Sequence, residues 1–145
     1  MPFPFKDPQK AADFLHEYLR ATQSDPVLYE AWKNLGMVVG FKIEDLRLGM
    51  GLDCTSGKEI VILRNYPEKP PSAAMKLSSD VFHDIFTGRL NVGMAFMKRL
   101  VRTEGNIAGI LKLSSLMPRN IKVYKDLLEA KGFDLTGVAK GGGQG

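Results

Sequence analysis

The stretch from Ala73 to Met117 most constrains the fold, because its hydrophobic pattern switches repeatedly between strand and helix. It predicts a strand, a helix, a short helix rich in Met and Phe, a second strand and a further helix. These helices carry more bulky apolar side chains than a domain of 145 residues obviously needs. The stretch has no combination of residues suited to catalysis. Surplus apolar surface without reactive groups favours storage or transport of an apolar molecule.

The composition indicates one ordinary globular domain. Hydrophobic residues make up 44% and charged residues 25% of the chain, which are average values. The apolar runs are far shorter than the ~20 residues of a membrane span. The first residues do not resemble a secretory signal, and Cys54 has no second cysteine with which to pair. We therefore expect a cytoplasmic protein.

Basic residues are concentrated towards the C-terminal end. From Lys98 onward there are nine basic and four acidic residues. Such asymmetry fits an anionic membrane or ligand, and the simpler alternative is the solvated face of a helix. Nucleic acid is not expected, because aromatic residues do not alternate with the basic ones. The candidate membrane-facing residues are Lys98, Arg99, Arg102, Arg119, Lys122 and Lys125.

Two helices are predicted at the N-terminal end. Each starts with an aspartate followed by proline, at Asp7 and at Asp25, which is a good helix start. The first helix has an apolar face that includes Phe14 and Tyr18, and the second ends at Gly36. We assign residues 1–36 to a helical segment packed on the domain.

Five strands are expected after these helices. Residues 39–44 and 46–53 alternate between apolar and other residues, and residues 58–65 complete a three-strand meander. Residues 73–77 form a crossover strand and residues 100–104 the last one. Small residues around Met50 would let a helix or a ligand approach the sheet. The expected fold is α/β of the α+β type, a mostly antiparallel five-stranded sheet with helices on one side.

The helices of the second half begin and end at recognisable residues. Ser78 and Asn91 are N-cap residues of two of them, another begins at Gly105–Asn106, and Pro118 opens the last, which closes at Gly132. The main domain is expected over residues 37–133. Residues 134–145 have little to bury and are expected to form a flexible tail.

The chain offers no convincing catalytic or metal-binding group. His16 and His83 are the only histidines, and both lie on helices with ordinary surface residues. One cysteine and two distant histidines do not predict a zinc site. The sequence therefore predicts no enzyme activity, no metal and no cofactor.

The order of the elements and one motif resemble the sterol-carrier-protein family of lipid-transfer domains, over roughly residues 37–117. The motif runs from Met75 to Phe82, continues with Phe86-Thr87-Gly88-Arg89-Leu90-Asn91, and then with Met94-Ala95-Phe96-Met97. A strand ending at Gly105-Asn106 and a helix over residues 109–113 follow. Lys98-Arg99 stand where the family has a glycine, and no peroxisomal address ends the sequence.

The resemblance implies an apolar tunnel between sheet and helices that binds a fatty acid, fatty acyl-CoA, sterol or phospholipid. We expect a cavity of ~300–1,000 Å³ beside the helices of residues 80–117. The implied ligand contacts are Phe82, Phe86, Met94, Met97, Ile110 and Leu113, with Leu48 and Met50 added from the sheet.

Three other interpretations remain open from the sequence. The apolar surplus could be plain core. It could close a homodimer or dock on an enzyme without any ligand. The domain could also present a lipid intermediate, such as a quinone precursor, to enzymes.

Overall fold

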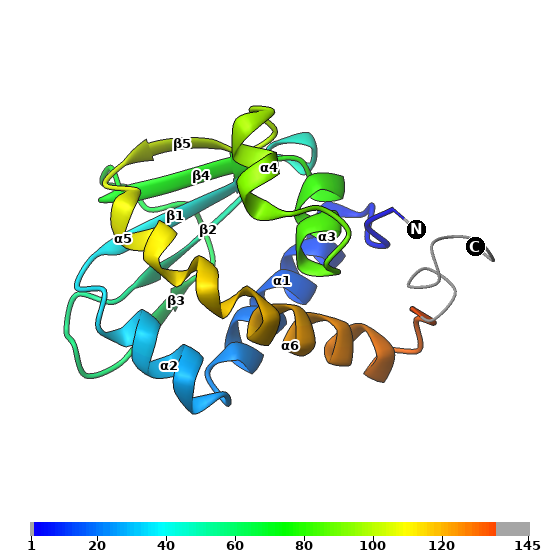
Figure 1. Cartoon of the computed structure of the whole chain (residues 1–145), viewed down its shortest axis with the longest axis horizontal. Coiled ribbons are helices and arrows are strands. Elements are labelled where there is room, and N and C mark those ends of the chain that lie inside the picture. The colour runs from blue at the N-terminus through cyan, green and yellow to red at the C-terminus, as the bar shows by residue number, and fades with distance from the viewer. Residues whose placement is uncertain (1, 136–145) are drawn as a thin grey trace.

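The computed structural model describes residues 2–135, which form one sheet and a set of helices (Figure 1). The helices are α1 (Pro8–Thr22), α2 (Pro26–Lys33), α3 (Ser79–Phe86), α4 (Val92–Met97), α5 (Ala108–Leu111) and α6 (Met117–Ala130), with 3₁₀ turns η1 (Glu44–Leu46) and η2 (Lys112–Leu116). The strands are β1 (Val38–Ile43), β2 (Leu48–Asp53), β3 (Val61–Leu63), β4 (Ala73–Leu77) and β5 (Arg102–Gly105).

The sheet has the predicted class and topology. Its strand order is β3-β2-β1-β4-β5. The meander β1-β2-β3 is antiparallel, β4 lies parallel to β1, and β5 returns antiparallel to β4. The expectation of a mostly antiparallel sheet with one crossover strand is therefore confirmed.

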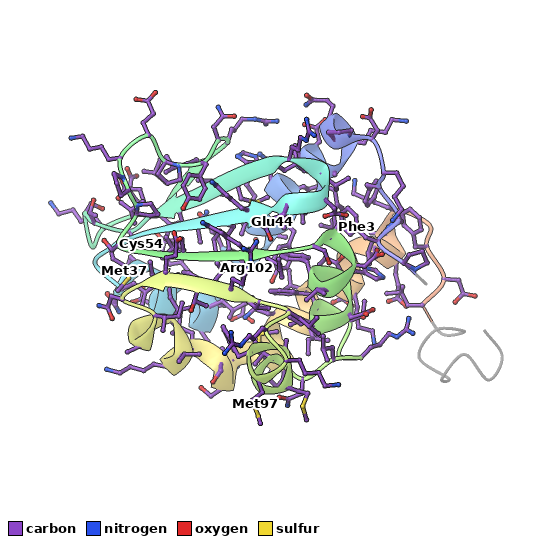
Figure 2. The ribbon with its side chains drawn as sticks, turned by 90° about the horizontal axis from the view of Figure 1, so that it is seen from above. Phe3, Met37, Glu44, Cys54, Met97 and Arg102 are labelled. Carbon is purple, nitrogen blue, oxygen red and sulfur yellow. The ribbon has the colours of Figure 1, made fainter. Side chains whose placement is uncertain are left out.

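Strand register gathers apolar side chains on one face of the sheet. Phe41 of β1 lies opposite Met50 of β2 and beside Met75 of β4. Because residues two apart share a face, Val39 and Ile43 line the same side. The helices cover this face, as the view in Figure 2 shows.

The opposite face is covered by a loop. A Cβ atom added at Gly49 would lie 2.6 Å from Cβ of Tyr66, and one at Gly40 would lie 2.8 Å from the Tyr66 ring. These glycines therefore let the loop around Tyr66 pack directly on the backbone. The sequence had suggested a helix or a ligand in this place.

The N-terminal segment shares the core of the main domain. Phe3, Phe14 and Tyr18 are buried with Tyr124 of α6 in one apolar cluster, and the Tyr18 and Tyr124 rings meet edge to face at 5.5 Å between centroids. Leu135 is also buried, with 2% of its surface exposed. Leu135, expected from the sequence to lie in the flexible tail, thus packs into the domain, and residues 136–145 lie outside the described part.

The N-cap residues recognised in the sequence predicted most helix starts correctly. Asp7, Asp25, Ser78 and Asn91 each accept a backbone hydrogen bond as N-cap residues.

Several regions differ from expectation. The helix expected from Gly105–Asn106 begins at Ala108 and becomes the 3₁₀ turn η2 after Leu111, and β2 begins at Leu48 because residues 44–46 form η1. β3 is shorter, and β5 starts only at Arg102. Before it, Arg99 has a left-handed backbone with φ 57°, and the N–H groups of Leu100 and Val101 bond to the Ala95 carbonyl of α4.

No helix in residues 2–135 is both long enough and apolar enough to cross a membrane.

Candidate functional site

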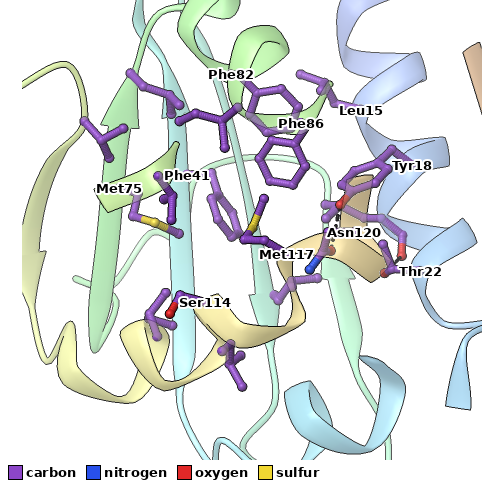
Figure 3. Close-up of a pocket in the computed structure, with 18 of the residues that line it drawn as sticks. Leu15, Tyr18, Thr22, Phe41, Met75, Phe82, Phe86, Ser114, Met117 and Asn120 are labelled. Atoms are coloured by element: carbon purple, nitrogen blue, oxygen red, sulfur yellow. Dashed lines mark hydrogen bonds between the residues drawn. The ribbon is translucent and has the colours of Figure 1, made fainter. Parts of the chain in front are cut away.

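An apolar cavity lies between the sheet and the helices (Figure 3). Its volume is about 120 Å³, which is below the expected ~300 Å³ minimum. Met50, Met75, Met117 and residues of the α5–η2 stretch are among those that line it. The lining residues come from the sheet (Phe41, Ile43, Met50, Leu52, Met75, Leu77), from α1–α2 (Leu15, Tyr18, Leu19, Thr22, Trp32), from α3, α4 and Val101 (Phe82, Ile85, Phe86, Val92, Phe96), and from α5–α6 (Ile110, Leu111, Leu113, Ser114, Met117, Asn120).

The helix α3 supplies a rigid aromatic wall. The rings of Phe82 and Phe86 stack with centroids 4.3 Å apart, because residues four apart share one face of a helix. Tyr18 of α1 meets both rings edge to face. This wall fixes one end of the cavity.

The opposite wall of the cavity is held by few hydrogen bonds and little buried surface. It consists of α5 and η2, and neither has a side-chain hydrogen bond at its N-cap. A 3₁₀ turn has poorer hydrogen bonds than an α-helix, and within this stretch only Ile110 is buried. Leu111 lines the cavity but is 43% exposed, so the mouth of the cavity lies here.

The polar groups of the cavity gather mainly where α1 meets α6. The Tyr18 hydroxyl donates to Oδ1 of Asn120 at 2.8 Å, and both residues are buried. Thr22 lies next to them, and its hydroxyl donates to the Leu19 carbonyl at 2.7 Å. Figure 3 shows the three together, whereas Ser114 lies apart near α5–η2. Burial raises the pKa of Tyr18 well above its ordinary value, so this phenol keeps its proton.

The groups that could be reactive lie elsewhere. His83 is buried, with Nδ1 2.8 Å from the Tyr124 hydroxyl, and it does not line the cavity. Burial lowers the pKa of His83 to about 4 and raises that of Cys54 to about 11. A neutral imidazole and a protonated thiol, both enclosed, are poorly suited to attack a substrate. Within residues 2–135 no cluster of His, Cys, Asp and Glu could hold a metal ion.

Five of the eight residues expected to contact a ligand line the cavity. They are Met50, Phe82, Phe86, Ile110 and Leu113. The other three do not: Leu48 packs against the core outside the cavity, and Met94 and Met97 are 44% and 79% exposed.

The helix α4 explains the position of the two exposed methionines. Val92 and Phe96, four residues apart, line the cavity, and Ala95 beside them is buried. Met94 and Met97 lie on the other face, and Met97 points away from the molecule in Figure 2. The two residues of α4 implied by the resemblance thus lie on the face that does not line the cavity, and their role as ligand contacts stays untested.

The six candidate membrane-facing cations separate into two groups. Three have acidic partners: Arg102 pairs with Glu44, as Figure 2 shows, and the others are Arg119 with Asp25 and Lys122 with Asp126. Lys98, Arg99 and Lys125 form no ion pair within the described residues, and Lys125 is partly buried on α6. Half of the candidate cations are therefore already paired with acidic side chains, and the assignment of the six as membrane-facing stays a prediction.

Several lining residues were not selected from the sequence. Tyr18, Thr22 and Trp32 belong to the N-terminal helices, and Asn120 to the last helix. Tyr18 appears in the sequence as a member of the apolar face of α1. Only the packing of α1 against α6 shows that it meets Asn120.

Comparisons with solved structures show the same fold in other proteins. The structure is similar to the sterol carrier protein domain 2 of Helicoverpa armigera, with a TM-score of 0.56, 20% identity, and coverage of 78% of this chain and 87% of that one. It is also similar to sterol carrier protein 2 from Yarrowia lipolytica in its apo form, with a TM-score of 0.53, 18% identity, and coverage of 74% and 88%.

A third similar structure is described as the UbiJ-SCP2 ubiquinone synthesis protein, with a TM-score of 0.52, 14% identity, and coverage of 76% and 94%. No curated protein sequence matches the chain. The profile of the SCP-2 sterol transfer family matches residues 15–118. This chain therefore belongs to the SCP-2 sterol transfer family.

Proposed function

We propose that the protein binds a single lipid in the cavity and carries it without chemical change. The observation that carries this proposal is an almost wholly apolar cavity between sheet and helices, open at one mouth, in a fold of the SCP-2 family. Burying methylene groups from water contributes ~0.8 kcal/mol each. Affinity therefore requires no reactive residue, and no enzymatic step is proposed.

Loading a lipid requires the cavity to widen. The volume of about 120 Å³ is too small for a long acyl chain. The α5–η2 stretch is the wall most able to move, because it is short, uncapped and mostly exposed. Met75 and Met117 can also change rotamer at little cost.

We further propose that the protein loads at an anionic membrane surface through a region that we name the rim. Its apolar members Met94, Met97, Leu100 and Leu111 are each at least 40% exposed. Its basic members Lys98, Arg99 and Lys112 are exposed and have no ion-pair partner within residues 2–135. Anionic lipids complement this charge, and exposed apolar side chains can enter the interface.

The rim is well placed for exchange. Leu111 belongs both to the rim and to the lining of the cavity, and α4 lines the cavity through Phe96. Figure 1 shows α4 and α5 on the same side of the sheet. A lipid leaving the membrane at the rim would therefore meet the movable wall.

Presentation of a lipid to enzymes is the second candidate function. The similarity of the fold to the UbiJ-SCP2 structure, described as a ubiquinone synthesis protein, is the reason to retain this second function. The same cavity would serve, but the bound lipid would be one defined intermediate.

Native mass spectrometry of the purified protein tests the proposal. We expect a monomer carrying one lipid, which solvent extraction then identifies. A mixture of common lipids would support general transfer, and one biosynthetic intermediate would support presentation. A dimer whose subunits remain empty after incubation with lipid vesicles would contradict lipid binding.

A further inference from the structure

The hydrogen bonds around Asn120 fix the orientation of its amide. The side-chain nitrogen donates to the Leu116 carbonyl at 3.3 Å, and that carbonyl can only accept. Oδ1 therefore faces the Tyr18 hydroxyl, which donates to it at 2.8 Å. The phenolic proton is thus already engaged.

The remaining hydrogen-bonding capacity at this position is small and specific. The Asn120 amide retains one N–H, since an amide has two. The oxygens of Tyr18 and Thr22 retain lone pairs, because each hydroxyl proton is donated elsewhere. A bound group would therefore meet one donor and two acceptors.

A hydroxyl group matches this arrangement. It can accept from the Asn120 amide and donate to the oxygen of Tyr18 or Thr22. A carboxylate can only accept, so its second oxygen would face lone pairs. Among the described residues that line the cavity, none carries a charge at neutral pH, and burying an unpaired carboxylate is strongly unfavourable.

We propose that the cavity prefers an uncharged lipid with a hydroxyl group, held at its inner end by the Asn120 amide and the Tyr18 phenol. This proposal rests on the proposed function, and it names the ligand class within it. A fatty acid could bind only with its carboxylate at the mouth. Its alkyl end would then lie against Tyr18 and Asn120, and the remaining hydrogen-bond donor and acceptors of these two side chains would stay unpaired.

The test compares 1-dodecanol with dodecanoate, two ligands that share chain length but differ in head group. Each displaces the apolar fluorophore diphenylhexatriene from the protein at neutral pH. We expect dodecanol to bind about tenfold more tightly than dodecanoate. The double variant Tyr18→Phe/Asn120→Leu should lose most of its affinity for dodecanol and retain its affinity for the fluorophore. Replacing both partners together leaves no unpaired polar group, so folding should be preserved.

Tyr124→Phe is the matched control. It removes a buried phenol that makes a 2.8 Å hydrogen bond to His83 but does not line the cavity, so neither affinity should change. If the double variant does not fold, the comparison of the two ligands on the wild-type protein still decides, because equal affinities for dodecanol and dodecanoate contradict the head-group assignment.

Equal affinities for the two ligands, or an unchanged alcohol preference in the double variant, would overturn the head-group assignment and leave lipid binding intact. Failure of the fluorophore and both ligands to bind the wild-type protein would instead overturn the proposed function.

Discussion

Nδ1 of His83 lies 2.8 Å from the hydroxyl oxygen of Tyr124, and both side chains are completely buried. This contact joins α3 to α6 behind the aromatic wall of the cavity. Burial lowers the pKa of His83 to about 4, and the positive charge of Arg89 contributes in the same direction. His83 is therefore neutral in the folded protein near pH 7.

The His83 contact predicts a loss of stability in acid. Below about pH 6.5 the unfolded chain takes up a proton that the folded protein does not bind until pH falls to about 4. The free energy of unfolding should therefore fall by up to ~1.4 kcal/mol per pH unit across this window. Urea unfolding at several pH values measures it. In His83→Leu/Tyr124→Phe the slope should be smaller, and an unchanged slope would show that another group is responsible.

Narrowing the mouth should weaken binding without unfolding the protein. Ser114 lines the cavity on an exposed turn, and its neighbour Ser115 is exposed but does not line it. We expect Ser114→Trp to weaken diphenylhexatriene binding about tenfold or more. Ser115→Trp is the matched control and should bind normally. Equal affinities in the two variants would contradict this location of the mouth.

Charge reversal should distinguish the rim from other basic residues. Replacing Lys98, Arg99 and Lys112 by Glu should slow lipid transfer to anionic vesicles strongly, since each cation contributes ~1 kcal/mol near such a surface. Raising the ionic strength towards about 0.15 M should reduce the effect. Arg119→Glu/Lys122→Glu changes paired cations on α6 and should have little effect on transfer. A stronger effect from this control pair would place the membrane surface on α6.

The close packing of the Tyr66 loop on Gly49 predicts an effect on the free energy of unfolding that is separate from ligand binding. A methyl group at Gly49 would meet Cβ of Tyr66 at 2.6 Å and its backbone nitrogen at 3.1 Å. Gly49→Ala should therefore destabilise the fold by ~1–3 kcal/mol, as overpacking does. Thermal unfolding measures this change, and ligand affinity at low temperature should be unaffected. A fully stable variant would mean that the loop can easily move away.

Much of the fold could be predicted because its signals are local. Four helix starts are marked by residues whose side chains accept the N-cap hydrogen bond: Asp7, Asp25, Ser78 and Asn91. The alternation of residues in β1 and β2 set the buried face of the sheet. The start of β5 was predicted less accurately. The backbone N–H groups of Leu100 and Val101 bond to the Ala95 carbonyl at the end of α4, and Arg99 has the left-handed backbone there although it is not a glycine.

The site was harder to predict because it depends on tertiary packing. α4 is only six residues long, so its apolar residues surround it and do not reveal which face is buried. Tyr18 and Asn120 are 102 residues apart in the sequence. Their meeting follows from the packing of α1 on α6, which hydrophobic periodicity does not encode.

The central claim is that a lipid enters this cavity, and NMR of methionine methyl groups tests it most directly. Met50, Met75 and Met117 line the cavity, whereas Met37, Met94 and Met97 do not. During titration with 1-dodecanol in the absence of membranes, we expect the first three methyl signals to shift together and saturate at one ligand per protein. Signals of Met94 and Met97 should stay in place. Shifts confined to Met94 and Met97, or no saturable shift at all, would contradict binding in the cavity.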